Sequence, residues 1–423
     1  MTFLALTLAA LLGSPRVTQD QSQPPPRTST LDSTMAAGEA EAVAPARELI
    51  RWNQFNGKYV TFKFGGGLLY DAANYSQDDS SREQFDLGAH NKVRDFRFTF
   101  RGRLKFIKGR EVTYTSGVMY DGPSGKWLVR ETGIMVQVSP NWGYIFVGRT
   151  KEGFSLNKVM VGYAGWTMER STINDATIPI LADGVKWIGY SKKLAVIWNL
   201  GFYGDAISVG QSFSTYRNQV AGRFAWVPIM SEQSGKVLHV GMSTRWGKPK
   251  DDTLQLRSRP EDFTSPYFVD TGKFSATHTT MVALEAYYRP GPLLFGSEYF
   301  WQQADAPLAG DPLSHGGEAV VTWLPTGETR VYNTKGGFFN QISPLRPVFK
   351  GGLGAWELVA RFSYINLNGG TLKGGTFWRF TPMVNWHLSD QVRLALAYGY
   401  GSLDRFELVG RTHFFQSRLQ LQF

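Results

Sequence analysis

Residues 92–106, KVRDFRFTFRGRLKF, alternate between apolar and charged side chains with a period of two. Phe96, Phe98 and Phe100 fall on one face, and Arg97 and Arg101 fall on the other. Because successive side chains of a β-strand point to opposite faces, the pattern predicts one strand with an apolar side and a cationic side. Such a strand fits a soluble sandwich, with the phenylalanines in a core. It also fits a membrane barrel, with the phenylalanines in lipid and the arginines in a wet lumen.

The remainder of the chain favours the barrel. Short alternating runs separated by turn residues continue from residue 49 to the end, without a long helical pattern or a repeat of propeller length. Strands are predicted at residues 59–64, 112–120, 134–138, 144–147, 186–190, 194–203, 237–246, 281–289, 293–301, 318–324, 356–367, 376–388, 392–400 and 411–423. Short turns, such as residues 325–327, alternate with long polar connections at residues 248–273 and 302–317. The expected fold class is all-β, a transmembrane antiparallel β-barrel.

Aromatic residues make up 14% of the chain, as expected where girdles of aromatic side chains mark both membrane interfaces. The last strand ends on Phe423, which shares a face with Phe415, Leu419 and Leu421. A terminal aromatic residue on an alternating strand is typical of outer-membrane barrels, and a soluble edge strand is the alternative. The three glycines of residues 65–67 lie within a strand, where they predict a bulge or a close approach of another group.

The first residues predict export. Residues 3–12, FLALTLAALL, are too few to span a bilayer but fit the apolar part of a signal peptide. The polar stretch that follows is rich in Pro, Ser and Thr and cannot bury enough apolar area to fold. We expect a signal peptide at residues 1–18, a flexible leader at residues 19–48 and a barrel domain at residues 49–423.

Catalytic, metal-binding and nucleotide-binding patterns are absent from the sequence. The chain has no Cys, its six His form no HExxH motif, and it contains neither GxSxG nor GxxxxGK[ST]. No enzyme, metal site or cofactor is therefore expected, although a barrel-embedded hydrolase with a Ser and His pair stays open. Arginines and aromatic residues alternate across two faces of residues 92–106, which argues against nucleic-acid binding.

Several stretches together resemble the phosphate-selective porin O and P family of Gram-negative outer membranes. They occur in family order between Tyr59 and Phe423, and each alone is weak. They are residues 93–97 (VRDFR), 148–149 (GR) with 152–158 (EGFSLNK), 166–170 (WTMER), 257–261 (RSRPE) through 269–272 (VDTG), 354–358 (GAWEL) and 416–419 (QSRL). The resemblance implies a 16-stranded barrel that forms homotrimers in the outer membrane, with loops folded inward to narrow each pore.

The resemblance also implies roles for individual cations. It places a constriction lysine at Lys158 and an arginine ladder at Arg257 and Arg259. An arginine pair near the start of an early strand matches Arg94, but its second position is Asp95. The charges are thus rearranged relative to the family, and a general anion pore is as well supported as a strict phosphate pore.

The expected function is passive diffusion of small inorganic anions, phosphate and chloride, through a lumen whose cations replace lost hydration. The net charge of +10 agrees with an anionic solute. The expected pore-lining residues are Arg94, Arg97, Arg101, Arg149, Lys158, Arg257 and Arg259. Arginines at the rim could instead bind phosphates of lipopolysaccharide, and a cation on a loop could simply be solvated. Alternatives are a general, weakly selective porin and a non-conducting adhesin barrel, suggested by the long loops.

The spacing of Arg257 and Arg259 predicts how the two side chains of the ladder are oriented. Arg257 and Arg259 are two residues apart, so in an extended segment their side chains face the same way. Pro260 opposes a helical turn through Arg259. Glu261 is the next residue on that side, and we expect it to neutralise the two arginines in part.

Overall fold

The computed structural model describes residues 52–122, 124–206, 216–231 and 235–423. The expected signal peptide, residues 1–18, and the expected leader, residues 19–48, lie outside the described residues. The strands belong to one compact unit, residues 32–423. No helix in the described part of the chain is long and apolar enough to cross a membrane.

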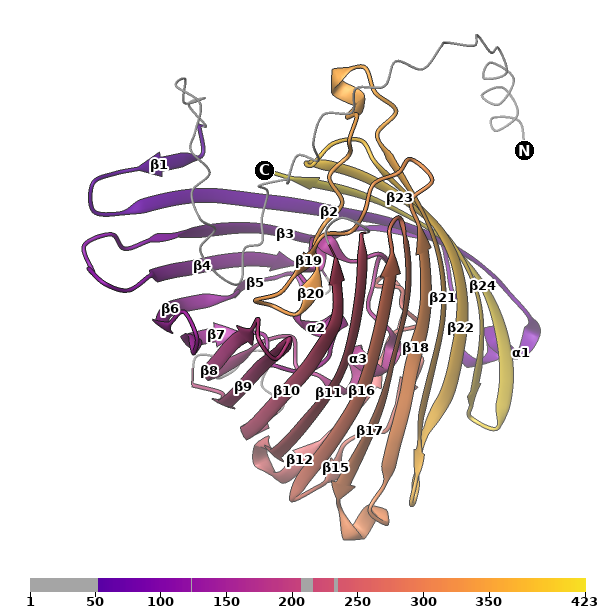
Figure 1. Ribbon diagram of the computed structural model, residues 1–423. Helices are drawn as coiled ribbons and strands as arrows, with labels where there is room; N and C mark the ends of the chain where they lie inside the picture. Colours follow the sequence, from indigo (N-terminus) through magenta and orange to yellow (C-terminus); the bar gives the residue numbers. More distant parts are fainter. Residues whose placement is uncertain (1–51, 123, 207–215, 232–234) are drawn as a thin grey trace. The chain divides into compact units, whose positions relative to one another are not determined.

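Sixteen antiparallel strands within the described residues form a closed barrel (Figure 1), which confirms the predicted fold class. Each wall strand pairs with the next, and β24 pairs with β2 to close the ring. The wall strands are β2 (Thr61–Gln77), β3 (His90–Arg103), β4 (Val112–Asp121), β6 (Thr132–Ser139), β7 (Gly143–Thr150), β8 (Ala182–Ser191), β9 (Val196–Gly204), β10 (Tyr216–Ser231), β11 (Lys236–Pro249), β16 (His278–Pro290), β17 (Leu293–Asp305), β18 (Leu313–Trp323), β21 (Ala355–Gly369), β22 (Leu372–His387), β23 (Val392–Arg405) and β24 (Leu408–Gln422). Two short strands, β1 (Gln54–Asn56) and β5 (Lys126–Val129), extend the same sheet.

The alternating sequence separates an apolar outer face from a mixed inner face. In β16, Val282 and Leu284 are exposed on the outside, while Met281 and Ala283 are buried inside. Many polar and charged side chains are buried on the inner face, among them Arg223 on β10. This inversion of the soluble pattern is what lipid around a closed barrel requires.

The carboxyl end of the chain seals the barrel. The backbone N–H of Gly66 donates to the carbonyl of Phe423 at 3.2 Å, and the Phe423 N–H donates back to Gly66 at 3.1 Å. A Cβ at Gly66 would lie 2.5 Å from the Phe423 ring, and one at Gly67 would lie 2.3 Å from the Tyr163 hydroxyl. The predicted close approach at residues 65–67 is therefore confirmed, because both faces of this strand carry a neighbour there.

Three long connections fill much of the lumen within the described residues. We call them the constriction segment (residues 151–181), the ladder segment (residues 250–277) and the hairpin segment (residues 324–354). They carry α2 (Leu156–Val159), η1 (Gly162–Ala164), α3 (Thr172–Thr177), η2 (Lys250–Asp252), β12 (Thr253–Leu254), β13 (Arg257–Ser258), β14 (Val269–Asp270), β15 (Phe274–Ser275), β19 (Tyr332–Asn333), β20 (Phe338–Phe339) and η4 (Val348–Lys350). In Figure 1, α2, α3, β19 and β20 lie within the ring of wall strands.

The inward segments come from both ends of the barrel. Connections alternate between the two ends, so the constriction and ladder segments leave one end, which also carries α1 (Asp79–Gln84) and η3 (Pro307–Ala309). We call this the long-loop end. The hairpin segment leaves the opposite, short-turn end, where the connections at residues 140–142 and 291–292 are brief.

Two predicted connections are wrong. The long loop predicted at residues 302–317 is mostly strand, because β17 continues to Asp305 and β18 begins at Leu313. Gln302 and Ser314 are polar yet buried on the inner face, where polarity does not signal a loop. The turn predicted at residues 325–327 is only the start of the hairpin segment, whose inward course depends on contacts far away in sequence.

Candidate functional site

A row of three glutamates on the inner wall fixes the constriction segment. Glu285, Glu298 and Glu318 lie directly opposite one another on β16, β17 and β18. Adjacent like charges in such register repel, so each carboxylate needs donors. The turn at residues 155–157 supplies them. The Ser155 hydroxyl donates to Glu298 at 2.6 Å. The backbone N–H of Leu156 donates to Glu285 at 2.7 Å, and the side-chain amide of Asn157 donates to Glu318.

Two arginines of the ladder segment stack on one tyrosine. The guanidinium carbons of Arg257 and Arg259 each lie 4.2 Å from the centroid of the Tyr267 ring. Arg259 also donates to the carbonyl of Ser265 at 2.9 Å. No carboxylate of the described residues forms an ion pair with either arginine. Asp270 lies opposite Arg257 on β14, but its carboxylate accepts from Gln255 at 2.8 Å. Both positive charges are therefore held in place by an aromatic face and by no ion pair.

A second ring extends this arrangement toward the wall. The Phe263 ring lies 5.8 Å from the guanidinium carbon of Arg259 and 4.5 Å from that of Arg94 on β3. Guanidinium groups and rings thus alternate in the order Arg257, Tyr267, Arg259, Phe263 and Arg94. We call these five residues the arginine–aromatic ladder.

Arg94 reaches the lumen because of a β-bulge. Strict alternation would place it on the outer face with Phe96, since both numbers are even. The register between β2 and β3 shifts at this point, however. Leu69 is opposite Asp95, whereas Tyr70 is opposite Val93, and Arg94 is left as the extra residue. A bulge re-aims side chains in this way, so Arg94 and Asp95 both contribute to the inner face.

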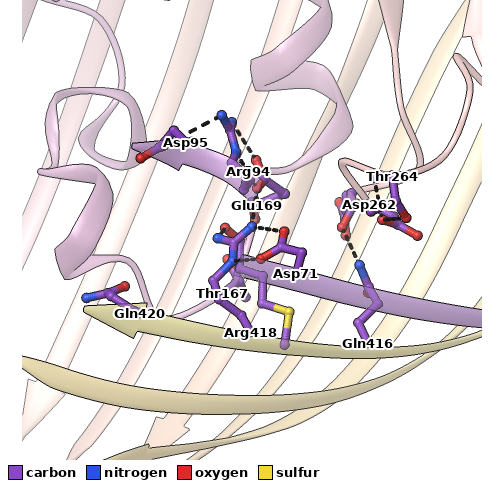
Figure 2. Close-up of polar contacts among 12 residues, drawn as sticks. Asp71, Arg94, Asp95, Thr167, Glu169, Asp262, Thr264, Gln416, Arg418 and Gln420 are labelled. Atoms are coloured by element: carbon purple, nitrogen blue, oxygen red, sulfur yellow. Dashed lines mark hydrogen bonds and ion pairs between the residues drawn. The ribbon is translucent and has the colours of Figure 1, made fainter. Parts of the chain in front are cut away.

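An alternating chain of charges surrounds the wall end of the ladder (Figure 2). Arg94 pairs with Glu169 at 3.0 Å and lies 3.7 Å from Asp95. Arg418 on β24 joins Glu169, at 2.5 Å, to Asp71 on β2, at 2.6 Å. Burial alone would raise the pKa of Glu169, but Arg94 and Arg418 outweigh burial and hold that pKa below its usual range. Glu169 is therefore a permanent anion beside the ladder.

Of the other two predicted cations of β3, Arg97 is bound to an acid. Arg97 is buried, pairs with Asp95 through an Nε–H bond of 2.9 Å, and stacks on the Tyr163 ring at 4.3 Å. Arg101 is half-buried further along the same inner face, opposite Thr115. Arg97 is thus bound to an acid two residues away, which the sequence placed on the same face.

Arg149 and Lys158 are buried, and their described contacts are with residues outside the ladder. Arg149, on β7, has no exposed surface and pairs with Asp183 on β8 at 2.8 Å. The Lys158 ammonium donates to the carbonyl of Ile178 at 3.1 Å. Burial, aided by the nearby Arg170, lowers the pKa of Lys158 to about 7. The structure therefore brings Arg94, Arg257 and Arg259 together and leaves these two cations in separate contacts.

The predicted position of Glu261 is wrong. Pro260 is the middle of a three-residue turn, closed by the Glu261 N–H donating to the carbonyl of Arg259 at 2.8 Å. Glu261 then adopts a left-handed backbone, with φ of 60°. Its side chain turns away from the two arginines and forms a buried ion pair with Arg361 on β21. It therefore anchors the ladder segment to the wall and does not neutralise the ladder.

Sequence reasoning missed several residues that shape this site. Tyr267 and Phe263 are the two rings of the ladder. Their role could not be predicted, because the sequence shows only aromatic residues in a polar segment. Glu169 and Arg418 lie within two of the family-like stretches, residues 166–170 and 416–419, but their pairing joins positions 249 residues apart. Only the folded register brings such positions together.

The sequence also matches known proteins. The family model for phosphate-selective porin O and P matches residues 62–423. The chain belongs to the phosphate-selective porin O and P family. The porin is 26% identical over 412 residues to an uncharacterised protein of Caulobacter vibrioides, covering 93% of this chain and 80% of that one. It is 24% identical over 203 residues to Porin O of Pseudomonas aeruginosa, covering 41% of this chain and 45% of that one.

Solved structures with the same fold are outer-membrane proteins. OmpT of Vibrio cholerae superimposes on the porin with a TM-score of 0.55 at 12% identity, covering 88% of this chain and 99% of that one. An anion-selective porin from Comamonas acidovorans superimposes with a TM-score of 0.52 at 12% identity, covering 86% and 100%. Family and fold together establish an integral β-barrel of the outer membrane that acts as a porin.

Proposed function

We propose that the porin is selective for small inorganic anions, phosphate and chloride, and that the arginine–aromatic ladder supplies the selectivity. The observation that carries this proposal is the pair Arg257 and Arg259, which are held by Tyr267 and have no carboxylate partner in the described chain. The name of the family and the fold shared with the anion-selective porin of Comamonas acidovorans agree with an anionic solute.

The geometry suits conduction as well as attraction. An anion that enters a narrow lumen loses hydration, and fixed cations at the constriction replace it. A guanidinium fork contacts two oxygens of phosphate at once, whereas chloride takes single contacts. Three guanidinium groups in a row offer several binding sites of moderate affinity. Moderate affinity is needed because an ion must leave each site in order to pass. The acids near Arg94 reduce its attraction, so Arg257 and Arg259 contribute most.

A planar bilayer experiment tests this function. The reversal potential of the reconstituted full-length protein in a KCl gradient should show preference for chloride over potassium. Added phosphate should reduce the chloride current, because a bound competitor slows a shared path. Cation selectivity would contradict the proposal, and equal permeability would favour a general porin. Insertion without any conductance would favour a binding or adhesin barrel with a plugged lumen.

We also propose that three copies of the chain form a homotrimer. The wall from β4 to β9 has strands of 8–10 residues, whereas β21, β22 and β24 have 15 or 16. A membrane-spanning strand needs about 9–11 residues, so β6 and β7, with 8 each, fall just short of the hydrocarbon thickness. Contact with neighbouring copies would shield this short wall from lipid. Native mass spectrometry should give the trimer, and a monomer would contradict it.

A further inference from the structure

A small cavity lies between the constriction segment, the wall strands β8 and β9, and the hairpin segment. Its volume is about 30 Å³, enough for one or two water-sized species. Lys151 and Val159 of the constriction segment, Lys186 on β8, Asn199 on β9, and Lys335 and Phe338 of the hairpin segment line it. Three different parts of the fold therefore contribute a lysine to one small space, and no ladder residue takes part.

Two of these lysines are buried without a counter-charge. Lys151 is 9% exposed and its ammonium donates to the carbonyl of Met160 at 2.6 Å. Lys186 is 7% exposed and donates to the Thr150 hydroxyl at 2.7 Å and to the carbonyl of Lys151 at 3.3 Å. Neither ammonium meets a carboxylate of the described residues within ion-pair distance. An ammonium has three donors, so both retain donors beyond these bonds.

The carboxylate that attracts both lysines forms its ion pair with another residue. Glu131 attracts Lys151 and Lys186 from beyond hydrogen-bond distance, but it is paired with Arg130 at 3.2 Å. Buried ammonium groups that remain charged without a counter-ion cost several kcal/mol each. Either the lysines lose their protons, or an anion enters the space between them. Burial and the nearby Arg170 do lower the pKa of Lys151 well below its usual value, so an empty cavity favours the neutral amine.

We propose that this cavity binds one small monatomic anion, such as chloride, held between Lys151, Lys186 and Lys335. The ion joins the constriction segment, the wall and the tip of the hairpin segment. It is a fixed structural ion and does not belong to the conducting path, because the cavity is small and is lined by none of the ladder residues. The inference is independent of the selectivity proposed above.

The hairpin tip is the element that such an ion would hold most. Lys335 is half-buried at this tip and also contacts Tyr144, at 3.1 Å from ammonium to hydroxyl. The adjoining carbonyl of Gly337 accepts from Arg223 at 2.8 Å. A central anion would bind the tip to both neighbours at once, whereas an empty cavity offers the tip no such shared contact.

Bromide provides a direct probe. Crystals of the full-length protein grown in about 0.15 M sodium bromide, a physiological ionic strength, should give an anomalous scattering peak within this cavity. The peak should disappear in Lys186→Met and in Lys335→Met, and it should persist in Lys350→Met, which alters an exposed lysine of the same hairpin segment. A cavity that holds only water in the wild type, or a peak unaffected by both lysine substitutions, would overturn the proposal.

Hydrogen exchange gives a second readout that does not need crystals. Amide exchange of residues 324–354 should be slower in chloride than in gluconate at equal ionic strength, since gluconate is too large for the cavity. Lys335→Met, at a half-buried position, should fold and lose this difference. Equal exchange in both salts would contradict the inference. Because neither measurement uses ion conduction, a failure here leaves the selectivity proposal intact, and the reverse also holds.

Discussion

The protein holds its arginines in two different ways, and Arg149 and Arg257 exemplify them. Arg149 is fully buried and bound to Asp183 at 2.8 Å. Arg257 is exposed, rests on the Tyr267 ring at 4.2 Å and forms no ion pair with a carboxylate of the described chain, although Asp270 lies opposite it on β14. Both arginines were predicted to line the pore, yet only Arg149 is bound to a carboxylate. A cation at a predicted pore-lining position is therefore insufficient for a role in anion passage, and the partner decides.

The physical reason lies in what each partner does to the charge. A buried carboxylate cancels the field of its arginine at a distance, and the pair behaves as a structural unit. An aromatic face attracts the cation through its quadrupole and leaves the net charge in place. Arg97, paired with Asp95, belongs to the first class, and Arg259 to the second. Arg94 is intermediate, because it touches both Phe263 and Glu169.

The largest expected effect comes from breaking a paired cation. Arg149→Met leaves Asp183 buried and charged, and should lower the free energy of unfolding by about 3–5 kcal/mol. Urea titration in detergent, followed by tryptophan fluorescence, measures this change. The double variant Arg149→Met with Asp183→Leu should recover most of the loss. A stable single variant with reduced anion selectivity would instead make Arg149 part of the conducting path.

Removing the anchor of the ladder segment should have the next largest effect. Glu261→Gln leaves Arg361 with Glu318 as its remaining acid, at 3.6 Å, so stability should fall by about 2 kcal/mol. The same urea titration reports it, with Glu83→Gln as a matched change at an exposed glutamate. If Glu261→Gln raised anion selectivity at constant stability, Glu261 would neutralise the ladder after all.

A smaller effect is expected from removing the ring beneath the stacked arginines. Tyr267→Leu deletes two cation–π contacts, each worth about 0.5–1 kcal/mol at an exposed site. Arg257 and Arg259 keep their charges but lose their fixed position. Single-channel recordings should show a modest loss of phosphate block with little change in chloride conductance. Tyr59→Leu, an exposed tyrosine at the short-turn end, is the control, and equal effects of the two would remove the assigned role of Tyr267.

The smallest effect concerns pH. The pKa of Lys158 is lowered by burial to about 7, so its ammonium charge is present below that pH and is lost as pH rises through it. Anion preference should therefore decline between about pH 6 and 8, by twofold or less because the group is buried apart from the ladder. The group binds fewer protons folded than unfolded between about pH 7 and 10.5, so its contribution to stability rises with pH there.

Bilayer recordings of Lys158→Met provide the matching control for this pH dependence. The variant should lack the step and stay at the high-pH selectivity of the wild type throughout. A step that persists in Lys158→Met would assign the titration to another group.

The sequence predicted much of the wall and less of the site. Period-two alternation is local information, so β3 and the strand ending at Phe423 could be recognised from residues 92–106 and 415–423 alone. The shared orientation of Arg257 and Arg259 follows from the same rule, and their common contact with Tyr267 agrees with it.

What the sequence could not supply depends on register and on distant partners. The bulge that turns Arg94 inward is a feature of two paired strands and leaves no mark on β3 itself. Asp183, which pairs with Arg149, is on another strand. Arg361, which pairs with Glu261, is 100 residues away from it in the sequence. The inward course of the hairpin segment likewise depends on contacts such as Arg330 with Glu357, at 2.7 Å.

The central claim is that stacked arginines set selectivity and paired arginines do not. The most direct test compares reversal potentials in a KCl gradient for three proteins: wild type, Arg257→Ala with Arg259→Ala, and Arg149→Met with Asp183→Leu. We predict that the first double variant loses most of the preference for chloride and that the second retains it. Unchanged selectivity in the ladder variant, or an equal loss in the variant without the ion pair, would contradict the account.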